Sequence, residues 1–124
     1  MKIKNRNIIT CLLATGLIIS ACKTNQVMVK FKNESAEDFK RLHVNIMGKE
    51  FHFTDLKSGN TTQYISVPKV YPYCWAQAIT EKDTLGFIPI DYVGEKLYTS
   101  GKLLMKLKIE GQDNMRRLEI SSKR

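Results

Sequence analysis

Hydrophobic and polar residues alternate along most of the chain from residue 26 onward. A period of two places successive side chains on opposite faces of a β-strand. The clearest example is the segment 102–110, in which Leu103, Met105, Leu107 and Ile109 share one face and lysines occupy the other. The pattern therefore predicts an all-β protein.

Turn residues divide this pattern into seven or eight short strands. The expected strands cover residues 27–32, 42–47, 50–54, 61–67, 73–80, 85–91, 102–110 and 116–121. Pro89 indicates that the strand 85–91 lies at a sheet edge or contains a bulge, because proline donates no ladder hydrogen bond. We predict a single antiparallel β-sandwich of immunoglobulin-like or transthyretin-like topology, with a small barrel as the alternative.

The first residues depart from this pattern. Lys2, Lys4 and Arg6 precede a mostly apolar stretch at 8–19, with no acidic residue before it. The stretch is too short to cross a bilayer, which takes about 20 residues. A basic segment followed by a short apolar one is typical of a secretion signal. We predict a cleaved, helical signal peptide at 1–21, a short tether at 22–26 and the β-sandwich domain at 27–124.

The signal ends in Ile19-Ser20-Ala21-Cys22, which resembles the lipobox of bacterial lipoproteins. The resemblance implies cleavage between Ala21 and Cys22, with a diacylglycerol and an N-acyl chain on Cys22. Two or three acyl chains would anchor the protein stably to a membrane. Lys23 follows the cysteine in place of an inner-membrane retention Asp, which favours the outer membrane of the cell envelope. Whether the domain faces the periplasm or the cell surface stays open.

The net charge and the cysteine content limit the kinds of molecule that this protein is expected to bind. Without the signal, 103 residues remain, with 17 Lys and Arg against 12 Asp and Glu, a net charge of about +5. Acidic residues separate these cations, which indicates solvated strand faces; attraction to lipid headgroups or acidic glycans is the alternative. We expect no nucleic-acid partner for an exported protein. Cys74 has no second thiol to pair with, so it is expected to be a buried small hydrophobe.

Several motifs resemble those of small uncharacterised lipoproteins of the Bacteroidota type. They are Phe51-His52-Phe53-Thr54-Asp55-Leu56-Lys57-Ser58-Gly59, Thr62-Gln63-Tyr64, Pro89-Ile90-Asp91-Tyr92-Val93-Gly94-Glu95 and Gly101-Lys102. This resemblance implies an envelope location and a β-sandwich, and it transfers no catalytic residue.

A weak candidate metal site involves His43, His52 and Glu50. A two-residue turn at Gly48-Lys49 would place Asn45 opposite His52, and His43 diagonal to it at roughly 7 to 8 Å. Zn²⁺ usually takes three or four protein ligands, so two surface histidines on a polar face are the more ordinary interpretation. A small metal-dependent hydrolase or metal-binding protein is the alternative function.

The segment from Asp91 to Gly101 is a candidate binding loop, contributed by Asp91, Tyr92, Glu95 and Tyr98. We expect Asp91 to cap backbone amides, Gly94 to adopt a positive φ, and a tyrosine hydroxyl to bond back to the main chain. Nothing indicates the cleft that a paired-acid hydrolase needs.

Tyr71 and Tyr73 flank Pro72 and form a candidate aromatic surface for a sugar or peptide, unless their rings close the open end of the sandwich. The chain lacks a Ser/His/Asp signature, a phosphate loop and a CxxC pair. We therefore predict a non-enzymatic binding or accessory module without a cofactor. It would bind an envelope protein, with strand addition to an exposed sheet edge as one mode of docking, or a glycan.

Overall fold

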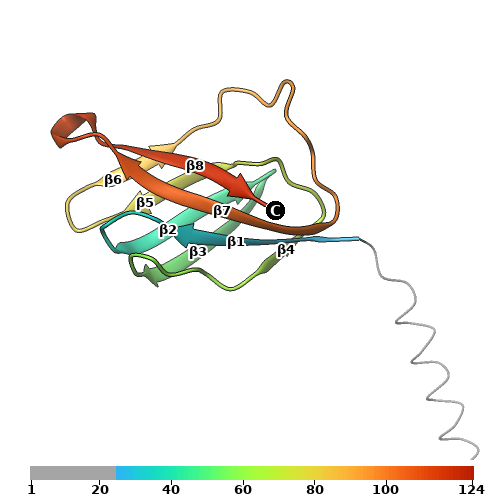
Figure 1. Cartoon of the computed structure of the whole chain (residues 1–124), viewed down its shortest axis with the longest axis horizontal. Helices are drawn as coiled ribbons and strands as arrows, with labels where there is room; N and C mark the ends of the chain where they lie inside the picture. Colours follow the sequence, from blue (N-terminus) through green and yellow to red (C-terminus); the bar gives the residue numbers. More distant parts are fainter. Residues whose placement is uncertain (1–24) are drawn as a thin grey trace, which may run out of the picture.

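The computed structural model describes residues 25–124, which form two four-stranded sheets packed as a sandwich (Figure 1). One sheet has the order β4-β1-β7-β8 and the other has the order β3-β2-β5-β6. The predicted signal peptide and its cleavage site at Ala21 and Cys22 lie outside the described residues. The all-β sandwich is confirmed.

Each of the eight strands overlaps one of the eight alternating segments. Their bounds are β1 Val27–Asn33, β2 Phe39–Ile46, β3 Lys49–Leu56, β4 Ile65–Val67, β5 Trp75–Ile79, β6 Thr84–Phe87, β7 Gly101–Glu110 and β8 Arg117–Lys123, with a 3-10 helix at Asp113–Met115. The strands expected at 61–67 and 85–91 are much shorter than predicted. β6 ends before Pro89 and lies at a sheet edge, as the proline indicated.

One sheet is mixed, so the prediction of a wholly antiparallel sandwich is wrong. β1 runs parallel to β7, with Val27 opposite Gly101 and Asn33 opposite Leu107. The other strand pairs are antiparallel. Alternation records which face of a strand is buried and carries no information about the direction of its neighbour. In the sequence, all strands of the second sheet lie between β1 and β7.

The core lies between the sheets and is built from side chains of both. Phe31 and Met105 are neighbours in one sheet, and Leu42 and Ala78 are neighbours in the other; all four are fully buried. Cys74 is buried beside Met105, with the two sulfur atoms 3.8 Å apart. Burial raises the pKa of Cys74 to about 12, so the thiol stays protonated at neutral pH. The expected burial of Cys74 is confirmed.

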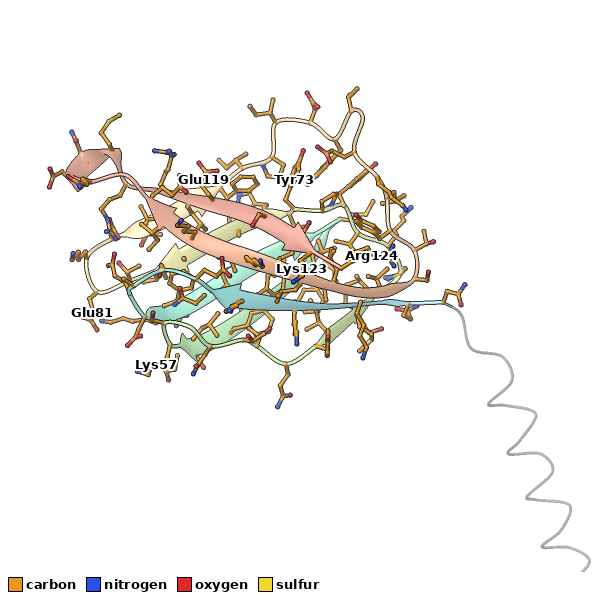
Figure 2. All side chains as sticks on the ribbon, in the orientation of Figure 1. Lys57, Tyr73, Glu81, Glu119, Lys123 and Arg124 are labelled. Carbon is orange, nitrogen blue, oxygen red and sulfur yellow. The ribbon has the colours of Figure 1, made fainter. Side chains whose placement is uncertain are left out.

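The strand directions place the connections between strands at two opposite ends of the sandwich. β1 begins at what we call the tether end, where the turn 47–48 and the long connection 88–100 also lie. The connections 34–38, 80–83 and 111–116 lie at the opposite, distal end. In Figure 2, Arg124 lies toward the tether end, whereas Lys57 and Glu81 lie at the distal end.

Arg116 joins three connections at the distal end. Its guanidinium donates to both carboxylate oxygens of Glu37, at 2.6 and 3.1 Å, and to both of Asp83, at 2.9 and 3.2 Å. Thr80 also donates to Asp83. These hydrogen bonds, that from Arg116 first, hold the pKa of Asp83 below its usual range.

Replacing Arg116 by glutamine is expected to lower the Tm at neutral pH by roughly 5 °C or more, because two partly buried carboxylates lose their partner. The lowered pKa of Asp83 means that this stabilisation exists above its unfolded-state pKa, near 3.9, and disappears as the pH falls through the lower folded-state pKa. The Tm difference between wild type and Arg116→Gln should therefore shrink in strong acid. Thermal unfolding followed by circular dichroism at both pH values measures it.

The matched control is Arg117→Gln, since Arg117 is the adjacent residue and its pairs with Glu110 and Glu119 are exposed. Exposed pairs contribute little, so the Tm of this variant should hardly change. Equal Tm values for the two variants would contradict the assigned role of Arg116.

Candidate functional site

The connection between β6 and β7, which we call the 88–100 loop, carries the most exposed large apolar side chains of the described chain. Ile88 is 73% exposed, Val93 88% and Ile90 97%. Figure 1 shows the loop projecting from the sandwich after β6 and returning down the tether end to β7. Exposed apolar side chains grouped on one segment mark an interaction surface more often than single ones do.

Hydrogen bonds within the loop hold its turn in one conformation. Asp91 Oδ1 accepts the backbone N–H of Val93 at 3.1 Å, and the N–H of Glu95 donates to the carbonyl of Tyr92 at 3.0 Å. Gly94 adopts a φ of +82°, which glycine enters without the steric cost of a side chain. The predicted capping by Asp91 and the positive φ of Gly94 are both confirmed.

A stack of tyrosine rings packs the loop against the segment that precedes β5. The ring of Tyr92 stacks on Tyr71 with centroids 4.1 Å apart and on Tyr73 at 5.4 Å. The hydroxyl of Tyr73 donates to the carbonyl of Asp91 at 3.1 Å, so the tyrosine bond to the loop backbone comes from the 71–73 segment and not, as expected, from a tyrosine of the loop. The candidate aromatic surface and the candidate binding loop are thus one structure. Tyr71 and Tyr73 are half-buried, and both offer a ring face to Tyr92.

Tyr73 and Tyr92 of the stack keep their protons at neutral pH. Partial burial raises the pKa of Tyr73, and the carboxylates of Glu95 and Asp91 raise it further. Burial likewise raises the pKa of Tyr92. A protonated Tyr73 remains a donor to the loop backbone at neutral pH, which suits a structural support and not a general base.

The returning part of the loop is fastened to the tether end of the sandwich. Tyr98 and Val70 exchange two backbone hydrogen bonds, at 3.0 and 2.8 Å. The guanidinium of Arg124 lies 4.8 Å from the ring centroid of Tyr98, and the ammonium of Lys96 lies 5.5 Å from it. Of the four residues predicted for the binding loop, Tyr92 and Tyr98 therefore pack against the domain, while Asp91 and Glu95 are exposed.

The histidines lie in a register different from the predicted one. Ile46 pairs with Lys49, so the turn is Met47-Gly48 and His43 lies directly opposite His52, not diagonal to it. Met47 reaches a positive φ of 52° and Gly48 one of 93°, as a two-residue hairpin turn of this kind requires. The shift of one residue follows from this turn geometry, which the alternation alone could not determine.

The two imidazoles stack with centroids 4.0 Å apart and an angle of 20° between their planes. Nitrogen lone pairs lie in the ring planes, so nearly parallel rings at this spacing do not direct them toward one ion. His43 Nε2 instead lies 2.9 Å from Glu50 Oε1, and the ring packs edge-on to Trp75. Residues 25–124 contain no group of three or more His, Cys, Asp or Glu side chains placed to hold a metal ion. The arrangement favours a structural role.

Sequence reasoning identified the loop by its polar and aromatic residues and missed its apolar ones. Ile88 and Ile90 flank Pro89 in an alternating pattern, which places both in the predicted strand 85–91. The proline was the available signal that the strand stops earlier and leaves these side chains without a sheet to pack on.

No helix among residues 25–124 is long and apolar enough to cross a membrane. No family model matches the chain, and neither does any curated protein or solved structure. The apolar side chains of the 88–100 loop, held on a tyrosine stack, are the feature of residues 25–124 from which a function can be inferred.

Proposed function

We propose that this protein is a lipid-anchored, non-enzymatic binding module of the cell envelope, and that the 88–100 loop is its binding surface. The exposure of Ile88, Ile90 and Val93 carries the proposal. Water contact at three neighbouring large apolar side chains is unfavourable, and a partner that covers them recovers about 25 cal/mol for each Å² of apolar surface.

The loop is suited to binding because its backbone is already ordered. The Asp91 turn, the Gly94 conformation and the bond from Tyr73 hold it without a partner. A preorganised loop loses little conformational entropy on binding. The lipobox-like segment ending at Cys22 supports anchorage, Lys23 supports delivery to the outer membrane, and an immunoglobulin-like or transthyretin-like arrangement is the topology proposed for the sandwich.

A photocrosslinking amino acid placed at position 90 in the full-length protein tests this function in intact cells. We expect irradiation to join position 90 to another envelope molecule, detected as a shifted band and identified by mass spectrometry. The expected yield is several-fold above that at a control position.

Met115 supplies the matched control position. It is also an apolar residue, 71% exposed, but it lies at the distal end in the 3-10 helix. Equal yields at positions 90 and 115, or no adduct at position 90, would show that the 88–100 loop is not the binding surface.

A further inference from the structure

The short connection to the lipid-carrying residue keeps the tether end close to the membrane. Val27, the first residue of β1, pairs with Gly101, the residue that follows the 88–100 loop. Five residues, 22–26, separate the proposed lipid from β1, and they span at most roughly 18 Å. The loop therefore returns to the sandwich beside the start of β1 (Figure 1).

The loop offers apolar side chains of the kind that enter the boundary between headgroups and acyl chains. The exposed side chains of Ile88, Ile90 and Val93 are aliphatic. They belong to a loop whose turn is stabilised by the hydrogen bond from the N–H of Val93 to Asp91. Leu97, further along the loop, is also partly exposed. Aliphatic side chains next to aromatic and basic ones are the composition that binds peripheral proteins to bilayers.

Basic side chains lie at the same end of the domain as the loop, and two of them contact it. Lys96 and Arg124 lie over the ring of Tyr98, and Arg124 also donates to the carbonyl of Ser100. The basic side chains at this end are Lys49, Lys69, Lys96, Lys102, Lys123 and Arg124. None of them forms an ion pair with a carboxylate of residues 25–124.

The distal end differs for most of its cations, although Lys82 in the connection 80–83 also forms no ion pair with a carboxylate of residues 25–124. Lys40, Lys57 and Arg116 each pair there with a carboxylate at 3.6 Å or less. Unpaired cations next to exposed aliphatic side chains complement a surface that is anionic outside and apolar within, which describes a bilayer containing acidic phospholipids.

We propose that the 88–100 loop inserts Ile88, Ile90 and Val93 into the bilayer that holds the acyl chains of Cys22, while the basic side chains contact its anionic headgroups. This inference rests on the proposed lipid anchor and on the loop as the binding surface, and it names the membrane as the ligand. The domain then has two membrane contacts, and its distal end faces away from the bilayer.

Fluorescence quenching in vesicles tests the inference on the processed, acylated protein that begins at Cys22. Ile90→Cys and Met115→Cys are each labelled with an environment-sensitive dye, since Cys22 is acylated and Cys74 is buried. The proteins are reconstituted into vesicles of phosphatidylcholine and phosphatidylglycerol in equal parts. Lipid-borne quenchers are expected to quench the dye at position 90 at least about threefold more than at position 115.

Flotation of the same samples separates the two proposals. If the protein floats with the vesicles and position 90 is quenched no more than position 115, membrane insertion is refuted. A protein adduct at position 90 in the crosslinking experiment then assigns the loop to a protein partner. If the protein does not float, the lipid anchor itself is refuted.

A second measurement tests the loop without the lipid. The described core runs from Val27 to Leu118, so a fragment of residues 25–124 retains it and omits the acylated segment. We expect it to bind the anionic vesicles weakly, with Ile90→Asp at least about tenfold weaker and Met115→Asp unchanged. Equal binding by the two aspartate variants, or none by the unsubstituted fragment, overturns the proposal.

Discussion

Replacing Asn33 by alanine is expected to lower the free energy of unfolding by about 3 kcal/mol, the largest loss at any polar residue of the described chain. Asn33 is fully buried at the end of β1. Its amide donates to the carbonyls of Glu37 and Leu56, at 2.8 and 3.0 Å. Its side-chain oxygen accepts from the N–H and the hydroxyl of Ser35.

The loss is large because alanine removes one side chain and leaves several buried groups without a partner. Each buried polar group that loses its hydrogen bond costs about 1 to 3 kcal/mol. The carbonyl of Leu56 belongs to the second sheet, so Asn33 also connects the two layers of the sandwich. Urea unfolding of the domain measures the change, with the slope of the transition checked for two-state behaviour.

Asn45→Ala is the matched control. Its side-chain oxygen accepts one hydrogen bond, from the N–H of Gly48 in an exposed turn, and water can replace it. This variant should lose less than about 1 kcal/mol. A loss at Asn33 no greater than at Asn45 would disprove the importance of the buried network.

Asn33→Asp separates the donor role from the volume of the side chain. Aspartate can still accept from Ser35, but an ionised carboxylate cannot donate to the two carbonyls and is desolvated, which raises its folded-state pKa. Below the unfolded-state pKa of this aspartate, its raised folded-state pKa costs no stability. The loss of stability grows as the pH rises through the folded-state pKa. The gap from wild type should therefore be wider at about pH 7 than at about pH 4.

The second large effect concerns Cys22, which lies outside the described residues. Growth with labelled palmitate is expected to label the wild-type protein, and Cys22→Ser is expected to abolish the label. The serine hydroxyl cannot form the thioether that the lipobox resemblance implies. The loss should be complete and not partial, because Cys22 is the predicted site of both the diacylglycerol and the N-acyl chain.

The chain provides two control cysteines for that experiment. Cys11 lies in the apolar part of the predicted signal, and Cys74 is buried in the core. Cys11→Ser and Cys74→Ser should both retain the palmitate label. Labelling that survives Cys22→Ser, or that is lost with Cys11→Ser, would contradict lipidation at Cys22.

The sequence determined by itself those properties that depend on local pattern. The alternation in 102–110 predicts β7 and its buried face, because a strand against a core must bury every second side chain. Local chemistry also predicts the turn around Asp91 and Gly94, since capping and a positive φ depend on the residues of the turn. The predicted lipid anchor is likewise a local motif at Cys22.

Only the tertiary structure decided what depends on distant neighbours. The direction of β7 beside β1, the one-residue register that stacks His43 on His52, and the joining of Tyr71 and Tyr73 to Tyr92 each bring together separate segments. Ile88 and Ile90 show the same limit, since their pattern is that of a buried strand and no second layer covers them. A period of two in the apolar residues shows which face of a strand could be buried. Whether that face is buried depends on a second layer that packs against it.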